Sequence, residues 1–444
     1  MQDLRMALRQ LWKRPALTVV ATLTLGLGIA ANGIVFTWVR AILLDTIPGA
    51  RNPGELVVLA PRHPEQGLGE SMSIPDLRVL ERDSGALAGA TGADMEPFAI
   101  RMEGRTEWVW GQPTLANFFE VLGVVPVLGR GFATGEDRPG APTQVVVISH
   151  RFWRTRMEGR TDVLGQVIHV NERALTVVGV APPEFQGTIS GLGFDLWVPL
   201  ASVVSEDELR RRDVEHGWRS MHGIARLSPG VGRREAAVRC ETVAGRLRAE
   251  FPNSHARLTF EVLPLWRSPW GGQSYFGPAL MALSVVGALL LMLVTANLAN
   301  LQLVRAMARE SEMAVRLAVG ASRWRLVRQL LLESLALGAL GGVLGLGLSA
   351  PGARLLKALM PPSYLPLQLG LTADYRVALA LAGVTVGVSL LFGLAPVRHA
   401  LNQRIQEALK VRGRGTTAGS GHRLRQAFVV TQVALAAGLL VGMG

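Results

Sequence analysis

Residues 305–334 read RAMARESEMAVRLAVGASRWRLVRQLLLES and lie between two long apolar runs. The apolar residues of this stretch recur near helical spacing, so one face of a helix can pack while the other stays charged. Gly320 predicts the end of that helix, because glycine adopts the left-handed conformation at little cost. Ser322 predicts the N-cap of a second helix that continues into the next apolar run. We therefore expect a helix, a tight turn and a helix at a membrane face.

Two interpretations of residues 305–328 stay open. In the first, they form a solvated connecting loop whose positive charge keeps it in the cytoplasm. In the second, they form a docking element for a soluble partner. The candidate site residues of this second interpretation are Arg305, Arg309, Glu310, Glu312, Arg316, Gly320, Ser322, Arg323 and Arg325.

The composition indicates a membrane protein. Of the 444 residues, 49% are hydrophobic and only 18% are charged, whereas globular chains carry roughly a quarter charged residues. A helix that spans a bilayer needs about 20 consecutive apolar residues. Runs near this length, free of Asp, Glu, Lys and Arg, cover residues 16–39, 280–304, 334–353, 377–397 and 426–444.

The net charge of +12 first points to nucleic acid, but its distribution does not. The basic excess is confined to residues 1–14, 305–328 and 398–425, beside the apolar runs and on alternate connections. This pattern predicts a cytoplasmic N-terminus, with residues 45–275 outside. Residues 1–14 predict an amphipathic helix lying on membrane lipids; a signal peptide is the alternative, but the apolar run that follows is longer than such peptides use. We expect no nucleic-acid partner.

Residues 45–275 predict an α+β domain, long enough to bury a core and to form more than one lobe. Short apolar runs typical of buried strands alternate with helical ones. The expected strands cover 56–59, 145–148, 174–180 and 197–200; the expected helices start at Ser73, surround Phe152 and Trp153, and cover 232–251; a hairpin is expected at Asn171 and Glu172. Cys240 is the single cysteine, so no intrachain disulfide can form and a buried apolar position is expected.

Several patterns of catalytic residues are missing from the sequence. A phosphate-binding loop needs a lysine directly after a glycine, and Lys13, Lys357 and Lys410 each follow another residue type. The histidines are scattered without metal-ligand spacing, and for His216 and His222, six residues apart, surface or core positions are favoured over metal ligation. We expect a chain that is no enzyme, has no metal site and binds no cofactor directly.

Several segments resemble the MacB/FtsX family of ATP-binding cassette transporter permeases. Residues 312–322, EMAVRLAVGAS, are similar to the family's cytoplasmic coupling helix, and residues 23–36, LTLGLGIAANGIVF, to its first membrane helix. Three segments resemble its periplasmic core domain: NFFEVLGVVPVLGRGF at 117–132, ISHRFWRTRMEGRTDVLGQVIHVNERALTVVGVAPPEFQG at 148–187, and ARLSPGVGRREAAVR at 225–239. In the family's duplicated orphan permeases a second repeat starts where residues 426–444 lie, so the chain resembles the N-terminal half of such a permease and is expected to be a fragment or a half.

The resemblance implies an α-helical transmembrane bundle of four complete spans and a partial fifth, with a large α+β extracytoplasmic domain between spans 1 and 2. The expected order is a cytoplasmic amphipathic helix at 1–14, a span at 16–40, the periplasmic core domain at 45–275, a span at 278–304, the coupling loop at 305–328, a span at 329–353, an outer loop at 354–374, a span at 375–397, a basic linker at 398–425, and the truncated span at 426–444.

The resemblance also implies a function in the bacterial inner membrane. A separate ATPase subunit would bind and hydrolyse ATP, and the permease would pass its motion to the periplasmic domain, which would export a hydrophobic drug, peptide or lipid-linked cargo, with a periplasmic adaptor as a further partner. The alternative is a non-transporting regulator of a cell-wall hydrolase or another periplasmic protein. A membrane-anchored sensor is a third class, disfavoured because the cytoplasmic segments are short.

The same mechanism implies two permease units around a two-fold axis, since each ATPase needs its own coupling loop. We therefore expect a homodimer or a pairing with a second permease half. Gly26, Gly28 and Gly33 make one side of the first span smooth, and small residues of this kind let membrane helices approach closely. These glycines are the candidate dimer contact.

Overall fold

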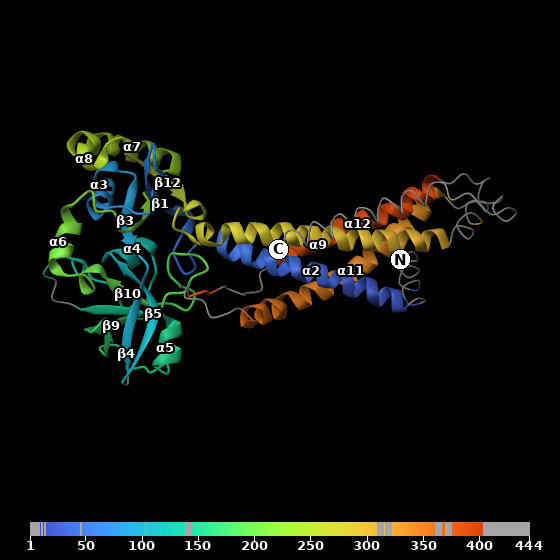
Figure 1. The fold of residues 1–444 in the computed structure, drawn as a ribbon, viewed down its shortest axis with the longest axis horizontal. Helices are drawn as coiled ribbons and strands as arrows, with labels where there is room; N and C mark the ends of the chain where they lie inside the picture. Colours follow the sequence, from blue (N-terminus) through green and yellow to red (C-terminus); the bar gives the residue numbers. More distant parts are fainter. Residues whose placement is uncertain are drawn as a thin grey trace. The chain divides into compact units, whose positions relative to one another are not determined.

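The computed structural model of the chain describes residues 9, 12, 15–44, 47–102, 104–138, 140, 144–308, 315, 322–359, 366–368 and 375–402. These residues fall into two compact units, which divide the sequence after Val39 and after Pro278. One unit holds the long apolar helices. The other holds Arg40–Pro278 together with residues 366–368. Figure 1 colours both along the chain.

The first unit contains the helices expected to cross the membrane. They are α2 (Pro15–Val39), α9 (Gly272–Ala308), α11 (Arg323–Leu359) and α12 (Tyr375–Asn402). Each is long and apolar enough to span a bilayer. The prediction of four complete spans, with an α+β domain between the first and the second, is confirmed. The partial fifth span at 426–444 lies outside the described residues, as do residues 403–425 and all of 1–14 except Arg9 and Trp12.

The helices are longer than the apolar runs that predicted them. α9 reaches Ala308 and α11 begins at Arg323, so both ends of the 305–328 stretch continue a membrane helix. At its other end α11 passes the expected boundary at residue 353 and reaches Leu359. Basic residues such as Arg354 and Lys357 are good helix formers, so a drop in hydropathy does not end a helix.

Close glycine contacts hold α11 against α2. A Cβ atom added at Gly341 would lie 2.7 Å from the side chain of Leu25, and one added at Gly345 would lie 2.7 Å from that of Ile29. Only glycine therefore lets the two helices approach this closely.

Two further contacts complete the bundle. The Asn32 side-chain amide of α2 donates to the carbonyl oxygens of Gly28 on its own helix and Gly287 on α9, both at 2.9 Å. A Cβ atom at Gly342 of α11 would lie 2.8 Å from Thr385 of α12. Polar and small residues thus join all the described membrane helices, as expected where lipid removes the hydrophobic driving force.

The structure corrects the proposed dimer contact. A Cβ atom added at Gly26, Gly28 or Gly33 would lie within 3.3 Å of a side chain on α11, α9 or α12, respectively. All three glycines are buried inside the bundle. The smooth side of α2 is therefore occupied by helices of the same chain, and a second copy has to use another surface.

The second unit is an α+β domain, as predicted. Its strands are β1 (Leu56–His63), β2 (Gly67–Leu68), β3 (Leu87–Ala93), β4 (Glu96–Met102), β5 (Arg105–Thr114), β6 (Leu128–Gly129), β7 (Val145–Ile148), β8 (Val167–Val170), β9 (Arg173–Val180), β10 (Leu196–Pro199), β11 (His222–Leu227) and β12 (Thr259–Pro264). Its α-helices are α3 (Ile74–Ser84), α4 (Phe118–Leu122), α5 (His150–Arg156), α6 (Glu206–Val214), α7 (Arg233–Glu250) and α8 (Pro252–His255).

The twelve described strands form one sheet in the order β10-β7-β9-β8-β4-β5-β3-β11-β1-β12, with β2 beside β1 and β6 beside β9. Because β10 also pairs with β5, in parallel, the strands from β10 to β5 close into a small barrel. In Figure 1 these strands lie at the end of the domain away from α7 and α8. Buried side chains such as Phe98, Val146 and Leu196 fill the barrel.

The remaining strands, β3, β11, β1 and β12, form an open sheet with a core on each face. Along β1, Val57 and Leu59 pack into one core, while Leu56 and Val58 pack into the other, as the alternation of a strand requires. The first core lies under α3 and α7 and includes Cys240, whose predicted burial is confirmed.

Local signals account for several element boundaries. The Ser149 hydroxyl accepts the backbone N–H of Phe152 at 2.9 Å and caps α5. Asn171 and Glu172 both have positive φ, 46° and 68°, which is the geometry of a tight hairpin turn between β8 and β9. The helix around Phe152 and Trp153 and the hairpin match the prediction, as does β7. Strand β1 runs four residues beyond the expected end and β9 begins one residue earlier than expected. Strand β10 differs by one residue, because Leu200 already begins a short 3-10 turn.

Candidate functional site

The described part of the 305–328 stretch consists of its two ends and Val315. Arg305 lies in the last turn of α9. The Ser322 hydroxyl accepts the backbone N–H of Arg325 at 3.3 Å, which confirms the predicted cap of α11. Arg323 and Arg325 occupy the first turn of that helix. The other candidate residues, Arg309, Glu310, Glu312, Arg316 and Gly320, lie outside the described residues.

The start of α11 concentrates positive charge. Arg325 and Arg328 are exposed and lie at the helix end where the backbone dipole is itself positive. Between these arginines and the cap stands Trp324, whose side chain is 70% exposed. Trp and Arg are the residue types that contribute most to protein interfaces. Sequence reasoning had not singled out Trp324, although a tryptophan beside arginines at a membrane face was a usable signal.

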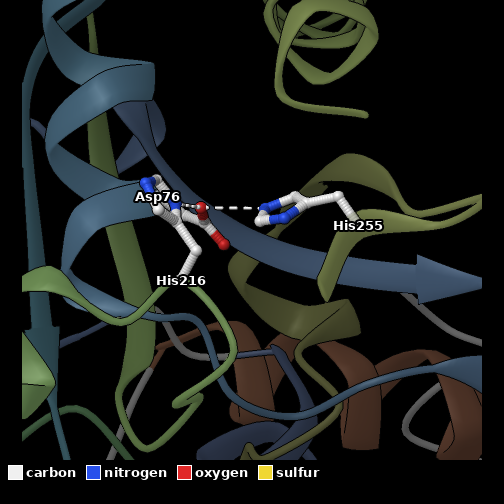
Figure 2. A group of neighbouring side chains, drawn as sticks. All are labelled: Asp76, His216 and His255. Carbon is white, nitrogen blue, oxygen red and sulfur yellow. Dashed lines mark hydrogen bonds and ion pairs between the residues drawn. The ribbon is translucent and has the colours of Figure 1, made fainter. Parts of the chain in front are cut away.

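A second group of candidate functional side chains lies in the α+β domain: Asp76, His216 and His255. One carboxylate oxygen of Asp76, Oδ1, lies 2.6 Å from His216 Nδ1 and 3.0 Å from His255 Nε2. Figure 2 shows both imidazoles turned toward this carboxylate. The potential ligand atoms of all three residues lie within 4.8 Å of one another.

Three separate segments supply this cluster. Asp76 stands in the first turn of α3, where the Ser73 hydroxyl accepts its backbone N–H at 3.2 Å. His216 follows α6, and its ring packs against Phe251 with centroids 4.0 Å apart. His255 is the last residue of α8, and its Nδ1 atom lies 2.9 Å from the Ser254 hydroxyl. The acidic side chain therefore occupies the helix end that favours negative charge.

The Asp76 carboxylate is charged although it is buried. Its side chain and that of His255 are 0% and 1% exposed, and that of His216 is 12% exposed. Burial by itself raises the pKa of the Asp76 carboxyl, but the hydrogen bonds from His255 and His216 outweigh it and lower the pKa below the ordinary value. The second carboxylate oxygen, Oδ2, has no hydrogen-bond partner among the described residues.

The sequence did not reveal this cluster. His216 and His255 lie 140 and 179 positions from Asp76, so no spacing rule links them. His216 and His222, whose spacing was considered for metal ligation, do not come together in the fold. His222 is buried and stacks on Trp270, with ring centroids 4.7 Å apart, as a core histidine would.

Comparison with known protein families decides the class of the chain. Residues 18–242 match the family model of the MacB-like periplasmic core domain, and residues 284–405 match that of the FtsX-like permease C-terminal region. The chain belongs to the MacB/FtsX-type permease family. This MacB/FtsX-type permease is thus a multi-pass inner-membrane protein with an extracytoplasmic domain between its first two spans.

Among its relatives is the "Probable export ATP-binding/permease protein MacB" of Pseudomonas entomophila, 24% identical over 294 residues that cover 66% of the permease and 41% of the relative. Another is the "Macrolide export ATP-binding/permease protein MacB" of Hahella chejuensis, 26% identical with the same coverage. The permease thus aligns with about 41% of the length of these relatives.

Solved structures similar to the permease include the periplasmic region of MacB from Actinobacillus actinomycetemcomitans. It shares 14% sequence identity, with a TM-score of 0.35, and the match covers 51% of the permease and 92% of that structure.

Proposed function

We propose that this MacB/FtsX-type permease is the membrane part of an ATP-driven exporter. The observation that carries the proposal is the order of its parts: a span, a large extracytoplasmic α+β domain, and a basic stretch that connects the second and third spans. The relatives quoted above carry the words export and ATP-binding/permease in their names. Orientation follows from charge, with the N-terminus and residues 305–328 in the cytoplasm.

In the proposed mechanism the permease transmits motion and catalyses no reaction itself. An ATP-binding cassette domain closes on ATP, pushes the stretch between α9 and α11, and so displaces both helices. α11 cannot move alone, because Gly341 and Gly345 lock it against α2 and Gly342 seats it against α12. The bundle therefore moves as a packed group, and its helices lead into the extracytoplasmic domain.

ATP belongs to a partner domain in this scheme. None of Lys13, Lys357 and Lys410 follows a glycine, so the given sequence holds no phosphate-binding loop.

The cargo is hydrophobic and already outside the membrane: a drug, a peptide or a lipid-linked compound. A periplasmic adaptor would receive it. The alternative, control of a cell-wall hydrolase by the same motion, differs in what the extracytoplasmic domain contacts.

A second permease unit is part of the proposal, either another copy of this chain or a separate half. Since the buried glycines of α2 face its own chain, the contact moves to the open side of that helix. There Val20, Leu23 and Leu27 lie about half exposed along an apolar groove of about 420 Å³ that Leu290 and Val294 of α9 complete.

The test is binding of the ATP-binding cassette protein to variants of the basic stretch. Arg316→Glu reverses a charge in the expected docking helix, and Gly320→Val opposes the left-handed turn expected there. Trp324→Ala removes an exposed aromatic and should weaken binding by about tenfold or more. Trp266→Ala is the matched control, because Trp266 is similarly exposed, 58%, but lies in the extracytoplasmic domain.

All four variants should insert into the membrane normally. Copurification of the ATPase should drop for the first three and stay unchanged for Trp266→Ala. If Arg316→Glu, Gly320→Val and Trp324→Ala retain the ATPase as well as the wild type does, residues 305–328 are only a positively charged connector. If the wild-type protein exports no cargo and a hydrolase is found bound to its extracytoplasmic domain, the alternative function as a regulator is favoured.

A further inference from the structure

We propose that Asp76, His216 and His255 form a transition-metal site in the extracytoplasmic domain, with Zn²⁺ as the favoured ion. The inference does not rest on the export proposal, because it concerns the domain alone. Two imidazole nitrogens and one carboxylate oxygen are a ligand set that zinc uses when a fourth position is left to water. Ca²⁺ and Mg²⁺ prefer oxygen ligands alone, so they fit this set poorly.

The distances agree with metal ligation after a small adjustment. In a tetrahedral zinc site with bonds of about 2.0–2.2 Å, neighbouring ligand atoms lie roughly 3.3–3.5 Å apart. His216 Nδ1 and His255 Nε2 lie 2.6 Å and 3.0 Å from Asp76 Oδ1, and all the ligand atoms fall within 4.8 Å. Side-chain movements of less than about 1 Å would therefore place the three atoms around one ion.

The unused oxygen of Asp76 is the second observation that points to a ligand. Its side chain is fully buried, yet Oδ2 has no hydrogen-bond partner in the described part of the chain. A buried polar atom without a partner costs roughly 1–3 kcal/mol. A cation held between the two imidazoles and both carboxylate oxygens would satisfy Oδ2 as well and neutralise the buried charge.

The surroundings suit a bound ion. A metal on His255 Nε2 requires the proton to sit on Nδ1, and the Ser254 hydroxyl at 2.9 Å can accept it. The Arg219 guanidinium donates to the Ser254 carbonyl at 2.8 Å and so holds this turn in place. His216 is 12% exposed, which leaves the fourth position an approach from solvent.

Binding would tie together three segments that lie far apart in the sequence: the start of α3, the connection after α6, and the turn that ends with α8. The ion would thus stabilise the part of the domain that carries the open sheet.

The first experiment uses the full chain, purified in detergent and stripped with a chelator, with Zn²⁺ and Co²⁺ as probes. The wild type should bind one equivalent of Zn²⁺, shift its unfolding to higher temperature, and give the intense visible absorption of tetrahedral Co²⁺. Mg²⁺ and Ca²⁺ should produce no shift. A stripped wild type that binds no Zn²⁺, or that shifts equally with Mg²⁺, overturns the proposal.

The second experiment assigns the ion to the cluster. Asp76→Asn keeps the size of the side chain, and His216→Gln changes the most accessible ligand. Each should lower the affinity for Zn²⁺ by at least about 100-fold, the upper range for loss of an outer-shell partner. His169→Gln, on β8 and outside the cluster, should bind as the wild type does. Unchanged affinity in both cluster variants would place the ion elsewhere and refute the site.

Discussion

His222 shows how burial turns one residue into a pH-sensitive element. Its imidazole stacks on Trp270, and its Nδ1 atom has no hydrogen-bond partner among the described residues. Burial lowers its pKa from 6.5 to about 4. In the unfolded chain His222 is therefore protonated as the pH falls below about 6.5, whereas in the folded domain it stays neutral down to about pH 4. The folded domain loses stability as the pH falls through this window.

At full development this loss amounts to roughly 3 kcal/mol, at 1.36 kcal/mol for each pKa unit. We expect His222→Phe, which keeps the stacking and removes the titration, to flatten the fall in unfolding temperature between pH 6.5 and pH 4. His169→Phe is the control and should keep the wild-type pH profile. A His222→Phe profile as steep as that of the wild type would mean that other groups cause the acid sensitivity.

The environment of a single residue could be predicted from the sequence where the residue type alone determines it. The burial of Cys240 followed from its residue type, and burial raises the pKa of its thiol to about 11, so it stays protonated and unreactive. The cluster of Asp76, His216 and His255 was not predictable, because three segments far apart in sequence meet only in the folded domain. A scan of spacing cannot detect such a site.

Two glycines of α11, Gly345 and Gly347, provide a test of the helix packing together with its control. In α11, a Cβ at Gly345 would lie 2.7 Å from Ile29 and 3.0 Å from the backbone oxygen of Gly26, whereas Gly347 has nothing within 4 Å. Gly345→Ala should push α11 from α2 and lower the unfolding temperature in detergent. Gly347→Ala should leave it unchanged or raise it, since alanine is the better helix former. Equal effects of both changes would refute the packing.

Local signals predicted the elements better than their partners. Ser322 marked the start of α11, and Asn171 and Glu172 marked a hairpin, because caps and turns depend on neighbouring residues alone. Gly26, Gly28 and Gly33 correctly indicated close packing, but the contact was wrongly given to a second copy. A small-residue face fits any helix, and only the folded bundle shows that α11, α9 and α12 occupy it.

The topology of the whole molecule is tested with reporter fusions. Basic residues gather in segments 1–14, 305–328 and 398–425, so these should lie in the cytoplasm. A fusion at Gln112, in the barrel of the extracytoplasmic domain, should report an outside location, while fusions at Gly320 and Gly415 should report the inside. A cytoplasmic signal at Gln112 would overturn the orientation and the transport scheme with it.

The central claim is that the stretch between α9 and α11 contacts an ATP-binding cassette domain. Val315 lies in this stretch, is helical and is 57% exposed, which suits a photoreactive amino acid at that position. Irradiation in intact membranes, followed by mass spectrometry of the adduct, should identify a domain with a phosphate-binding loop. The same probe at Trp108, 71% exposed in the extracytoplasmic domain, should capture no such domain. Adducts at Val315 that never contain an ATP-binding cassette domain would contradict the account.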